Sequence, residues 1–309
     1  MKKILALLLA ATLCLAGLTA LAEEEEKVLN VFTWEGYFDE TTLAQFTEET
    51  GIQVNYSTFA SNEEMMLKLQ ANGGSEYDIV LARDYAISTI RKEGLIQPLD
   101  KSLLTNWDNL NPDYLNQYFD PDNVYSMPYT VGSPMIVYDP DQVDGELTSF
   151  SDLWREDLAD SLWLIDDARV IVGETLRSLG YSYNTTEQSQ LDEAAAKLAG
   201  LKPNIRVLDY DMTYNYLTAG EVKAAYLFTP FVVLSLQENP NLVAVFPSEG
   251  FGVDSIVIPV NAPHPNNAHA FMNFYLRADI AAGEAEFRIG GGDARVPARQ
   301  RFSAQTRAQ

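Results

Sequence analysis

Two aromatic rings and a carboxylate stand together near the start of the chain, where Trp34, Glu35 and Tyr37 follow the β-rich run 28–33. Aromatic faces and carboxylates both attract organic cations. Residues 39–46, which come next, carry the signals of a helix start. A strand that ends in such side chains before a helix places them at the carboxyl edge of a sheet, where open α/β folds bind ligands. Burial of Trp34 and Tyr37 in the core is the alternative, and the local sequence favours neither.

Strand and helix patterns alternate through the first third of the chain. Apolar alternation predicts the strands, and Gly51, Gly73 and Gly94 stand where the helices should end. The expected elements are a strand at 28–33, a helix capped by Asp39 or Thr41 and ending at 50, a strand at 52–56, a helix at 61–72, a strand at 77–81 and a helix at 84–93. This β-α-β-α-β-α order predicts a largely parallel sheet.

A second lobe is expected to open near residue 131, after a polar and irregular segment at 98–122. Its expected elements are strands at 135–138, 162–165, 206–208 and 224–228 and helices at 169–179, 188–199 and 231–237. The apolar strand at 255–260 is expected to return to the first lobe. The sequence therefore predicts an α/β protein with a first lobe of residues 23–130 plus 255–282 and a second lobe of residues 131–254.

The composition is that of a globular protein, with 47% hydrophobic and 21% charged residues. Its 44 acidic residues outnumber its 21 basic ones, which gives a formal charge of −23. This balance disfavours nucleic acid and anionic membrane surfaces as partners, because both repel an acidic protein. It permits a cationic ligand without requiring one.

The start of the chain is typical of a secretory signal. Two lysines precede an apolar run at 4–20, and the small-x-small triplet that ends it predicts a signal peptide of residues 1–22. A membrane-anchored start is the alternative, although the run is short for a spanning helix. We therefore expect an exported protein, in a periplasmic space or at the outer face of the cell membrane. The single cysteine, Cys14, lies inside the signal, so the mature chain should have neither a disulfide nor a thiol nucleophile.

The sequence lacks the common motifs of catalysis. It contains no phosphate-binding loop, no glycine-rich dinucleotide turn and no nucleophile elbow. His264 and His269 stand in a segment rich in proline and asparagine, where an exposed loop and helix start is expected rather than a metal or catalytic site. Asp166 and Asp167 could form a general acid/base pair, but neighbours on a strand point to opposite faces. We therefore expect binding without turnover, and neither a cofactor nor a metal.

Separated sequence blocks carry a family resemblance. In the first lobe they are TWEGY at 33–37, QFTEETGI at 45–52, YSTF at 56–59, SNE at 61–63, YDIV at 77–80, RKEGLI at 91–96, FDPDN at 119–123 and YSMPY at 125–129. In the second lobe and the return strand they are SDLW at 151–154, DDAR at 166–169 and VDS at 253–255. Together, and in this order, they resemble the spermidine/putrescine-binding family, the extracellular solute-binding proteins of polyamine ABC transporters.

This resemblance implies the type II periplasmic-binding-protein fold, in which two α/β lobes joined by crossover strands close over a ligand in the cleft. The crossovers would fall near 129–134 and 253–260. It also implies the solute-binding component of an ABC importer, which captures putrescine or spermidine outside the membrane and delivers it to the permease. We expect a monomer with no enzymatic activity. A receptor for another small cationic or zwitterionic solute, or an exported α/β hydrolase, is the alternative.

Family members stack the methylenes of a polyamine between aromatic rings and pair its ammonium groups with carboxylates, because each ammonium has three donors to satisfy. The positions that match this pattern are Trp34, Tyr37 and Tyr85 in the first lobe and Asp167, Phe228 and Asp254 in the second lobe and the hinge. Glu35 and Asp84 are added as candidate acids. These eight side chains form the predicted ligand site.

Two departures from the family pattern change the expected charge of this site. The acid that follows the first tryptophan has moved by one position, to Glu35. Arg83 stands where a small hydroxyl residue is usual, and an unpaired cation there would repel a polyamine. We expect that Asp84 neutralises Arg83 or that Arg83 turns away.

Two further contacts of the family are missing. Val170 stands in place of an acid, and Gly252 stands in place of a large ring near the hinge. Glu174, one helical turn beyond Val170, could supply a substitute charge. Because fewer ammonium contacts remain, a putrescine-like diamine or spermidine is the expected ligand.

The end of the chain departs from the family pattern altogether. The pattern holds through residues 271–282 and dissolves in the arginine-rich segment 283–309. Residues from 290 onwards carry little apolar surface to bury, so we expect disorder there. A frameshift near Gly283 is the expected cause, and a lineage-specific tail is the alternative.

Overall fold

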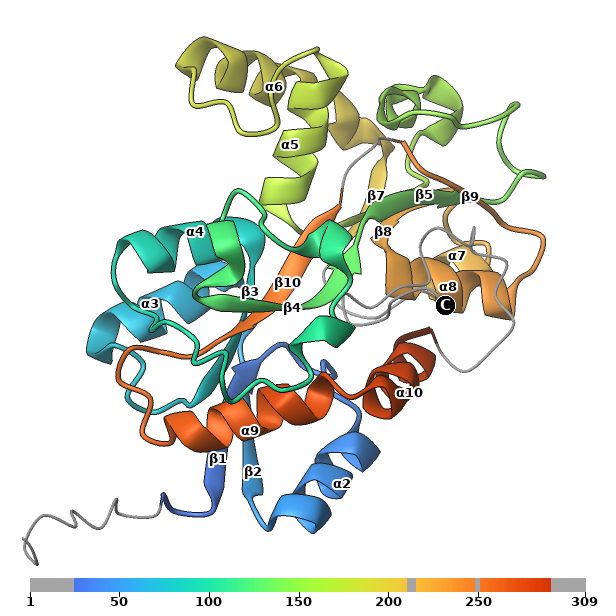
Figure 1. Cartoon of the computed structure of the whole chain (residues 1–309). Helices are drawn as coiled ribbons and strands as arrows, with labels where there is room; N and C mark the ends of the chain where they lie inside the picture. The colour runs from blue at the N-terminus through green and yellow to red at the C-terminus, as the bar shows by residue number, and fades with distance from the viewer. Residues whose placement is uncertain (1–24, 210–214, 248–250, 290–309) are drawn as a thin grey trace, which may run out of the picture.

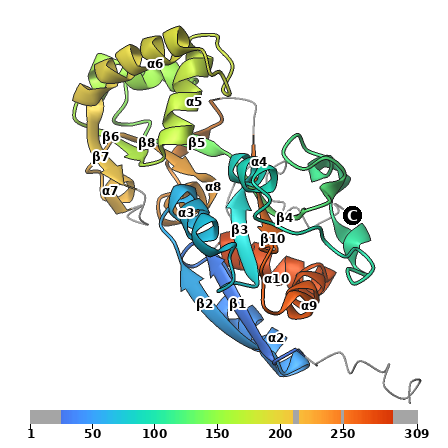
Figure 2. The ribbon, with the colours of Figure 1, turned by 90° about the vertical axis from the view of Figure 1, so that its left-hand side faces the viewer.

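The computed structural model describes residues 25–209, 215–247 and 251–289, with side chains as far as residue 284. The predicted signal peptide and the chain from residue 290 onwards lie outside the described residues. Two five-stranded sheets, each flanked by helices, form two lobes (Figures 1 and 2). The predicted α/β class with two lobes is confirmed.

The first lobe contains a sheet with the strand order β2-β1-β3-β10-β4. Its strands are β1 (Val28–Thr33), β2 (Gln53–Thr58), β3 (Ile79–Arg83), β4 (Ser126–Gly132) and β10 (Gly252–Val257). Strand β1 runs parallel to β2 and β3, as predicted, whereas β10 runs antiparallel to β3 and β4. The helices between the first strands are α2 (Glu40–Thr50), α3 (Asn62–Asn72) and α4 (Asp84–Lys92).

The second lobe contains a sheet with the strand order β7-β6-β8-β5-β9. Its strands are β5 (Pro134–Tyr138), β6 (Leu162–Ile165), β7 (Ile205–Asp209), β8 (Ala224–Phe228) and β9 (Val243–Val245). Strand β6 is parallel to β7 and β8, and β5 is antiparallel to β8 and β9. The helices of this lobe are α5 (Ala168–Ser178), α6 (Gln188–Leu201), α7 (Asn215–Thr218) and α8 (Thr229–Glu238).

The predicted helix boundaries follow from local chemistry. Ser61 precedes α3, and its hydroxyl accepts a hydrogen bond from the backbone N–H of Glu64, which satisfies one free donor of the first turn. Gly51 and Gly73 end α2 and α3 in the left-handed conformation, with φ of 74° and 66°. Glycine adopts this conformation without a steric penalty, so these positions end the helices at the residues that the sequence indicated.

The chain passes from one sheet to the other within a single residue, because β4 ends at Gly132 and β5 begins at Pro134. It returns through β10, which begins at Gly252 and not at residue 255 as predicted. The prediction followed the apolar run, whereas the hydrogen-bonded ladder with β4 begins three residues earlier. Asp254 therefore lies within the strand, in register with Arg83 of β3.

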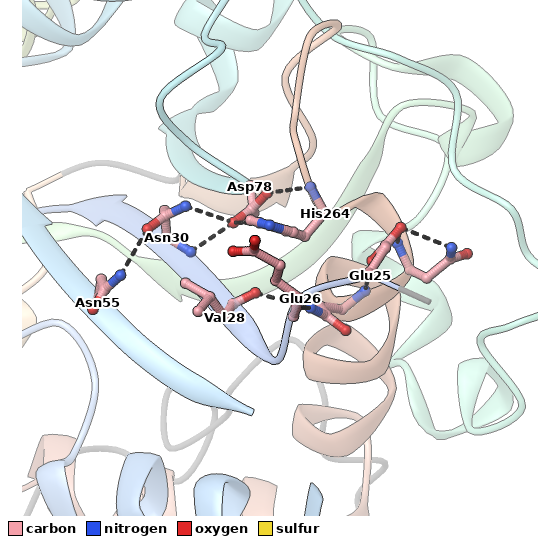
Figure 3. A network of polar contacts seen from close by, with 9 residues as sticks. Glu25, Glu26, Val28, Asn30, Asn55, Asp78 and His264 are labelled. Carbon is pink, nitrogen blue, oxygen red and sulfur yellow. Dashed lines mark hydrogen bonds and ion pairs between the residues drawn. The ribbon is translucent and has the colours of Figure 1, made fainter. Parts of the chain in front are cut away.

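Buried Asp78 connects β1 to the segment that precedes α9 (Pro265–Tyr275), as Figure 3 shows. Its Oδ2 accepts hydrogen bonds from the backbone and side-chain N–H groups of Asn30, at 2.7 and 3.1 Å. Its Oδ1 accepts from the backbone N–H of His264 at 2.6 Å, and the Nδ1 atom of that histidine ring lies 3.1 Å from Oδ2. This one carboxylate thus holds three distant parts of the first lobe together.

Both histidines have structural contacts, and the exposure expected for them is wrong. His269 lies inside α9 and is only 5% exposed. Its Nε2 accepts from the backbone N–H of Asp100 at 2.8 Å, and Nδ1 lies 2.6 Å from the carbonyl oxygen of Pro265, to which it donates. The predicted helix start is confirmed. The sequence could not show that other segments of the chain cover the two histidine side chains. Among the residues that the structure describes, no group of three His, Cys, Asp or Glu side chains could hold a metal ion.

The last helix, α10 (Ala278–Ile289), continues through Gly283, where the family pattern was expected to end. Glu284 is 1% exposed, and its Oε2 accepts a hydrogen bond from the Tyr129 hydroxyl at 2.9 Å. The helix contacts α2 and α9 of the first lobe and α8 of the second. The frameshift near Gly283 stays a prediction. None of the described helices combines the length and hydrophobicity that a bilayer-spanning segment needs.

Candidate ligand-binding site

The guanidinium group of Arg83 lies between the two lobes and touches three of the predicted site residues. Its Nη1 is 2.9 Å from Oδ2 of Asp167, and its Nε is 3.3 Å from Oδ1 of Asp254. The guanidinium carbon lies 4.6 Å from the centre of the Phe228 ring. The three charged side chains are only 14–15% exposed. A cation is thus held by two carboxylates and an aromatic face.

Elements of both lobes position these groups. Strands β3 and β10 pair Arg83 with Asp254 in the first sheet. Asp167 caps α5 of the second lobe, where its Oδ1 accepts the backbone N–H of Val170 at 3.0 Å, which leaves Oδ2 for Arg83. Phe228 ends β8, also in the second lobe. The acceptor set is therefore complete only when the lobes lie together.

Tyr37 joins this cluster from the loop after β1. Its hydroxyl donates to Oδ2 of Asp254. Its backbone N–H donates to the hydroxyl of Tyr56 at 3.1 Å, and that hydroxyl donates to the carbonyl oxygen of Trp34 at 2.8 Å. Gly36, with a φ of 63°, makes the turn that brings the two aromatic residues together.

The Trp34 ring packs on the first-lobe core. It is 6% exposed, and its centre lies 5.0 Å from that of Tyr37 and 4.7 Å from that of Phe59. Its buried indole N–H finds no acceptor in the described part of the chain. Glu35, by contrast, is exposed, and it makes no hydrogen bond or ion pair with other described residues. The shifted acid therefore makes no hydrogen bond or ion pair with the residues of the Arg83 cluster.

Asp84 and Tyr85 follow Arg83 at the start of α4. Burial raises the pKa of Asp84, and the nearby charge of Asp254 raises it further, whereas Arg83 acts in the opposite direction. The Tyr85 hydroxyl donates to Oε1 of Glu63 at 3.0 Å, and burial together with this acid raises the pKa of the phenol. Both side chains thus border the cluster, and Asp84 is a third acidic group beside Asp167 and Asp254.

Comparison with known proteins places this geometry in a family. The family described as bacterial extracellular solute-binding protein matches residues 41–303. The chain belongs to this family. As a solute-binding protein it is 40% identical to the spermidine/putrescine-binding periplasmic protein of Escherichia coli K12, over 99% of this chain and 88% of that one. It is also 32% identical to a putrescine-binding periplasmic protein of Pseudomonas aeruginosa, over 91% and 81% of the two chains.

Solved structures agree with the fold. The spermidine/putrescine ABC transporter substrate-binding protein of Streptococcus pneumoniae is 37% identical, with a TM-score of 0.74 over 89% of this solute-binding protein and 87% of that chain. The TpPotD lipoprotein of Treponema pallidum is 30% identical, with a TM-score of 0.77 over 84% and 82% of the two chains. The predicted periplasmic-binding-protein fold is confirmed.

The structure corrects the expectation for Arg83 in this solute-binding protein. The side chain does not turn away, and its ion pairs go to Asp167 and Asp254 rather than to Asp84. The Oδ1 atom of Asp84 instead accepts the backbone N–H of Tyr85 at 2.6 Å. No local pattern in the sequence predicts the contact with Asp254, because that contact depends on the register of β10 against β3.

Two further groups near the site were missed or placed differently. The guanidinium carbon of Arg169 lies 5.6 Å from the ring centre of Tyr85 and 5.0 Å from that of Tyr183, so a second cation borders the cleft. Glu174, the expected substitute charge, is buried and lies 3.8 Å from Arg177 on its own helix. Its charge is therefore already partly balanced.

Proposed function

We propose that this solute-binding protein captures a polyamine, putrescine or spermidine, outside the membrane and delivers it to the permease of an ABC importer. One observation carries the proposal: Asp167, Asp254 and Phe228 already hold a cation between the lobes. A primary ammonium has the charge and the donors that this set accepts. The relatives that are named for spermidine or putrescine support the same ligand class.

The remaining groups suit the carbon chain of such a ligand. Tyr37 and Phe228 flank the carboxylates with aromatic faces, and methylenes next to an ammonium pack favourably on such faces. The Trp34 ring, whose centre lies 5.0 Å from that of Tyr37, backs this aromatic face from the first-lobe core. Because Glu35 makes no ion pair with the cluster, Asp167 and Asp254 are the acids that contact a cation there, and two acids suit a short diamine better than a triamine. We infer binding without chemical turnover.

Calorimetric titration of the mature protein with putrescine, spermidine and spermine tests this function. We expect saturable heat with putrescine or spermidine, and recovery of the ligand unchanged after separation. Butane-1,4-diol is the matched control, because it keeps the carbon chain of putrescine and lacks both charges. Absence of heat with all three polyamines would refute the ligand class and leave the fold intact.

A further inference from the structure

We propose that Arg83 is a built-in competitor for the ligand: its guanidinium occupies the cation subsite of Asp167, Asp254 and Phe228, and a ligand ammonium must displace it. The inference rests on the proposed function for the identity of the displacing ligand. Arg83 would then determine ligand specificity. It stands where the family resemblance implies a small hydroxyl residue.

The first argument is chemical equivalence. A polyamine subsite needs a carboxylate for the ammonium and an aromatic face for the adjoining methylenes. Arg83 uses the same parts, since it donates to Asp167 at 2.9 Å and to Asp254 at 3.3 Å and lies 4.6 Å from the Phe228 ring centre. Two cations cannot share these acceptors at close range without mutual repulsion. The ligand and Arg83 are therefore alternatives at this subsite.

The second argument is that Arg83 connects the lobes. It belongs to β3 of the first sheet, whereas Asp167 and Phe228 belong to the second lobe. A hydrogen-bonded series runs from Tyr37 through Asp254 and Arg83 to Asp167. A ligand ammonium would make these same contacts across the cleft. Arg83 should therefore hold the ligand-free protein in a closed form.

The displaced guanidinium has an acceptor within reach. Asp84 is its neighbour in the chain, and it lies close enough that the charge of Arg83 lowers the Asp84 pKa against the larger effect of burial. Displacement still breaks two charge-assisted hydrogen bonds of Arg83. Loss of one such bond changes a binding constant by about tenfold or more. We therefore expect Arg83 to weaken polyamine binding at least tenfold relative to a small residue at this position.

The test compares the wild-type protein with Arg83→Ser and Arg83→Lys. Arg206→Ser is the matched control, because Arg206 pairs with Asp160 at the surface of the second lobe. Calorimetry with putrescine and spermidine gives the affinities. Small-angle scattering of the ligand-free proteins gives their radii of gyration, and circular dichroism checks that each variant is folded.

We expect Arg83→Ser to bind putrescine or spermidine at least tenfold more tightly and to have a larger radius that shrinks on ligand addition. Arg83→Lys, which keeps the charge but not the paired donors, should fall between it and the wild type. If Arg83→Ser and the wild type bind with the same affinity, the inference is overturned while the proposed function stands. If no polyamine binds either protein, the proposed ligand is wrong. Expansion of ligand-free Arg83→Ser would then still support Arg83 as the cation that bridges the lobes at this subsite, and an unchanged radius would overturn the inference.

Discussion

Asp254 uses both carboxylate oxygens, so its replacement by asparagine is a sharp test of the site. Oδ2 accepts from the Tyr37 hydroxyl, and Oδ1 accepts from Nε of Arg83. Asp254→Asn removes the charge and turns one acceptor into a donor. A charge-assisted hydrogen bond contributes roughly 1.5–3 kcal/mol, which corresponds to about 10- to 150-fold in affinity. Because the substitution also loosens the competing Arg83, we expect putrescine binding to weaken by about tenfold, at the lower end of this range.

Calorimetry of the wild type, Asp254→Asn and a control variant measures this change. Asp108→Asn is the control, because Asp108 is exposed in a short helical turn of the first lobe and the charge change is the same. The control should bind putrescine like the wild type. If Asp254→Asn also binds within about twofold of the wild type, Asp254 has a structural role only, and the reasoning that gives it an ammonium is wrong.

Three further substitutions test stability by thermal unfolding. Asp78→Ala should destabilise the protein by about 3 kcal/mol, because buried donors on two segments lose their acceptor. Asp84→Asn should raise the melting temperature near neutral pH and not near pH 3. Burial raises the pKa of Asp84, so the folded protein holds this proton more tightly than the unfolded chain, and stability is lost as the pH rises through the folded-state pKa. Gly173→Ala should destabilise the second lobe by roughly 1–3 kcal/mol, because the added Cβ would lie 2.2 Å from the Tyr183 ring.

For each of these three substitutions, one result would contradict the prediction. A loss of less than about 1 kcal/mol in Asp78→Ala would show that water replaces the carboxylate. If Asp84→Asn changes the melting temperature equally at neutral pH and near pH 3, titration of the Asp84 carboxyl is not the cause of the change. Gly283→Ala is the control for Gly173, since its Cβ would meet nothing within 4 Å and a helix-interior alanine usually stabilises by about 0.5–1 kcal/mol. Stabilisation by Gly173→Ala as well would mean that the Tyr183 ring moves aside freely.

Local signals in the sequence predicted the elements and the chain positions of several residues that meet around Arg83. Asp167 precedes a helix as its cap, and that local role fixes its position at the cleft. Tyr37 follows a strand and reaches Asp254, as a residue at the carboxyl edge of a sheet can. The site residues as a set stay a proposal. Their types and strand-end positions are nevertheless readable from sequence, because each depends on a few neighbouring residues.

Contacts between distant segments could not be read in the same way. Arg83 and Asp254 are 171 residues apart, and they meet only because β10 pairs with β3 in one register. The contacts of His269 and Glu284 could not be predicted from local sequence either. His269 stands in a polar segment, which suggested exposure, but its ring accepts from Asp100. The Glu284 carboxylate is buried against Tyr129. In each case tertiary packing decides which groups face a polar side chain.

A crystal structure of the mature protein with saturating putrescine tests the central claim most directly. We predict one ammonium between the lobes, about 2.7–3.2 Å from carboxylate oxygens of Asp167 and Asp254, with Arg83 moved away from both. A putrescine-free cleft in which Arg83 still bridges the two carboxylates would contradict this claim.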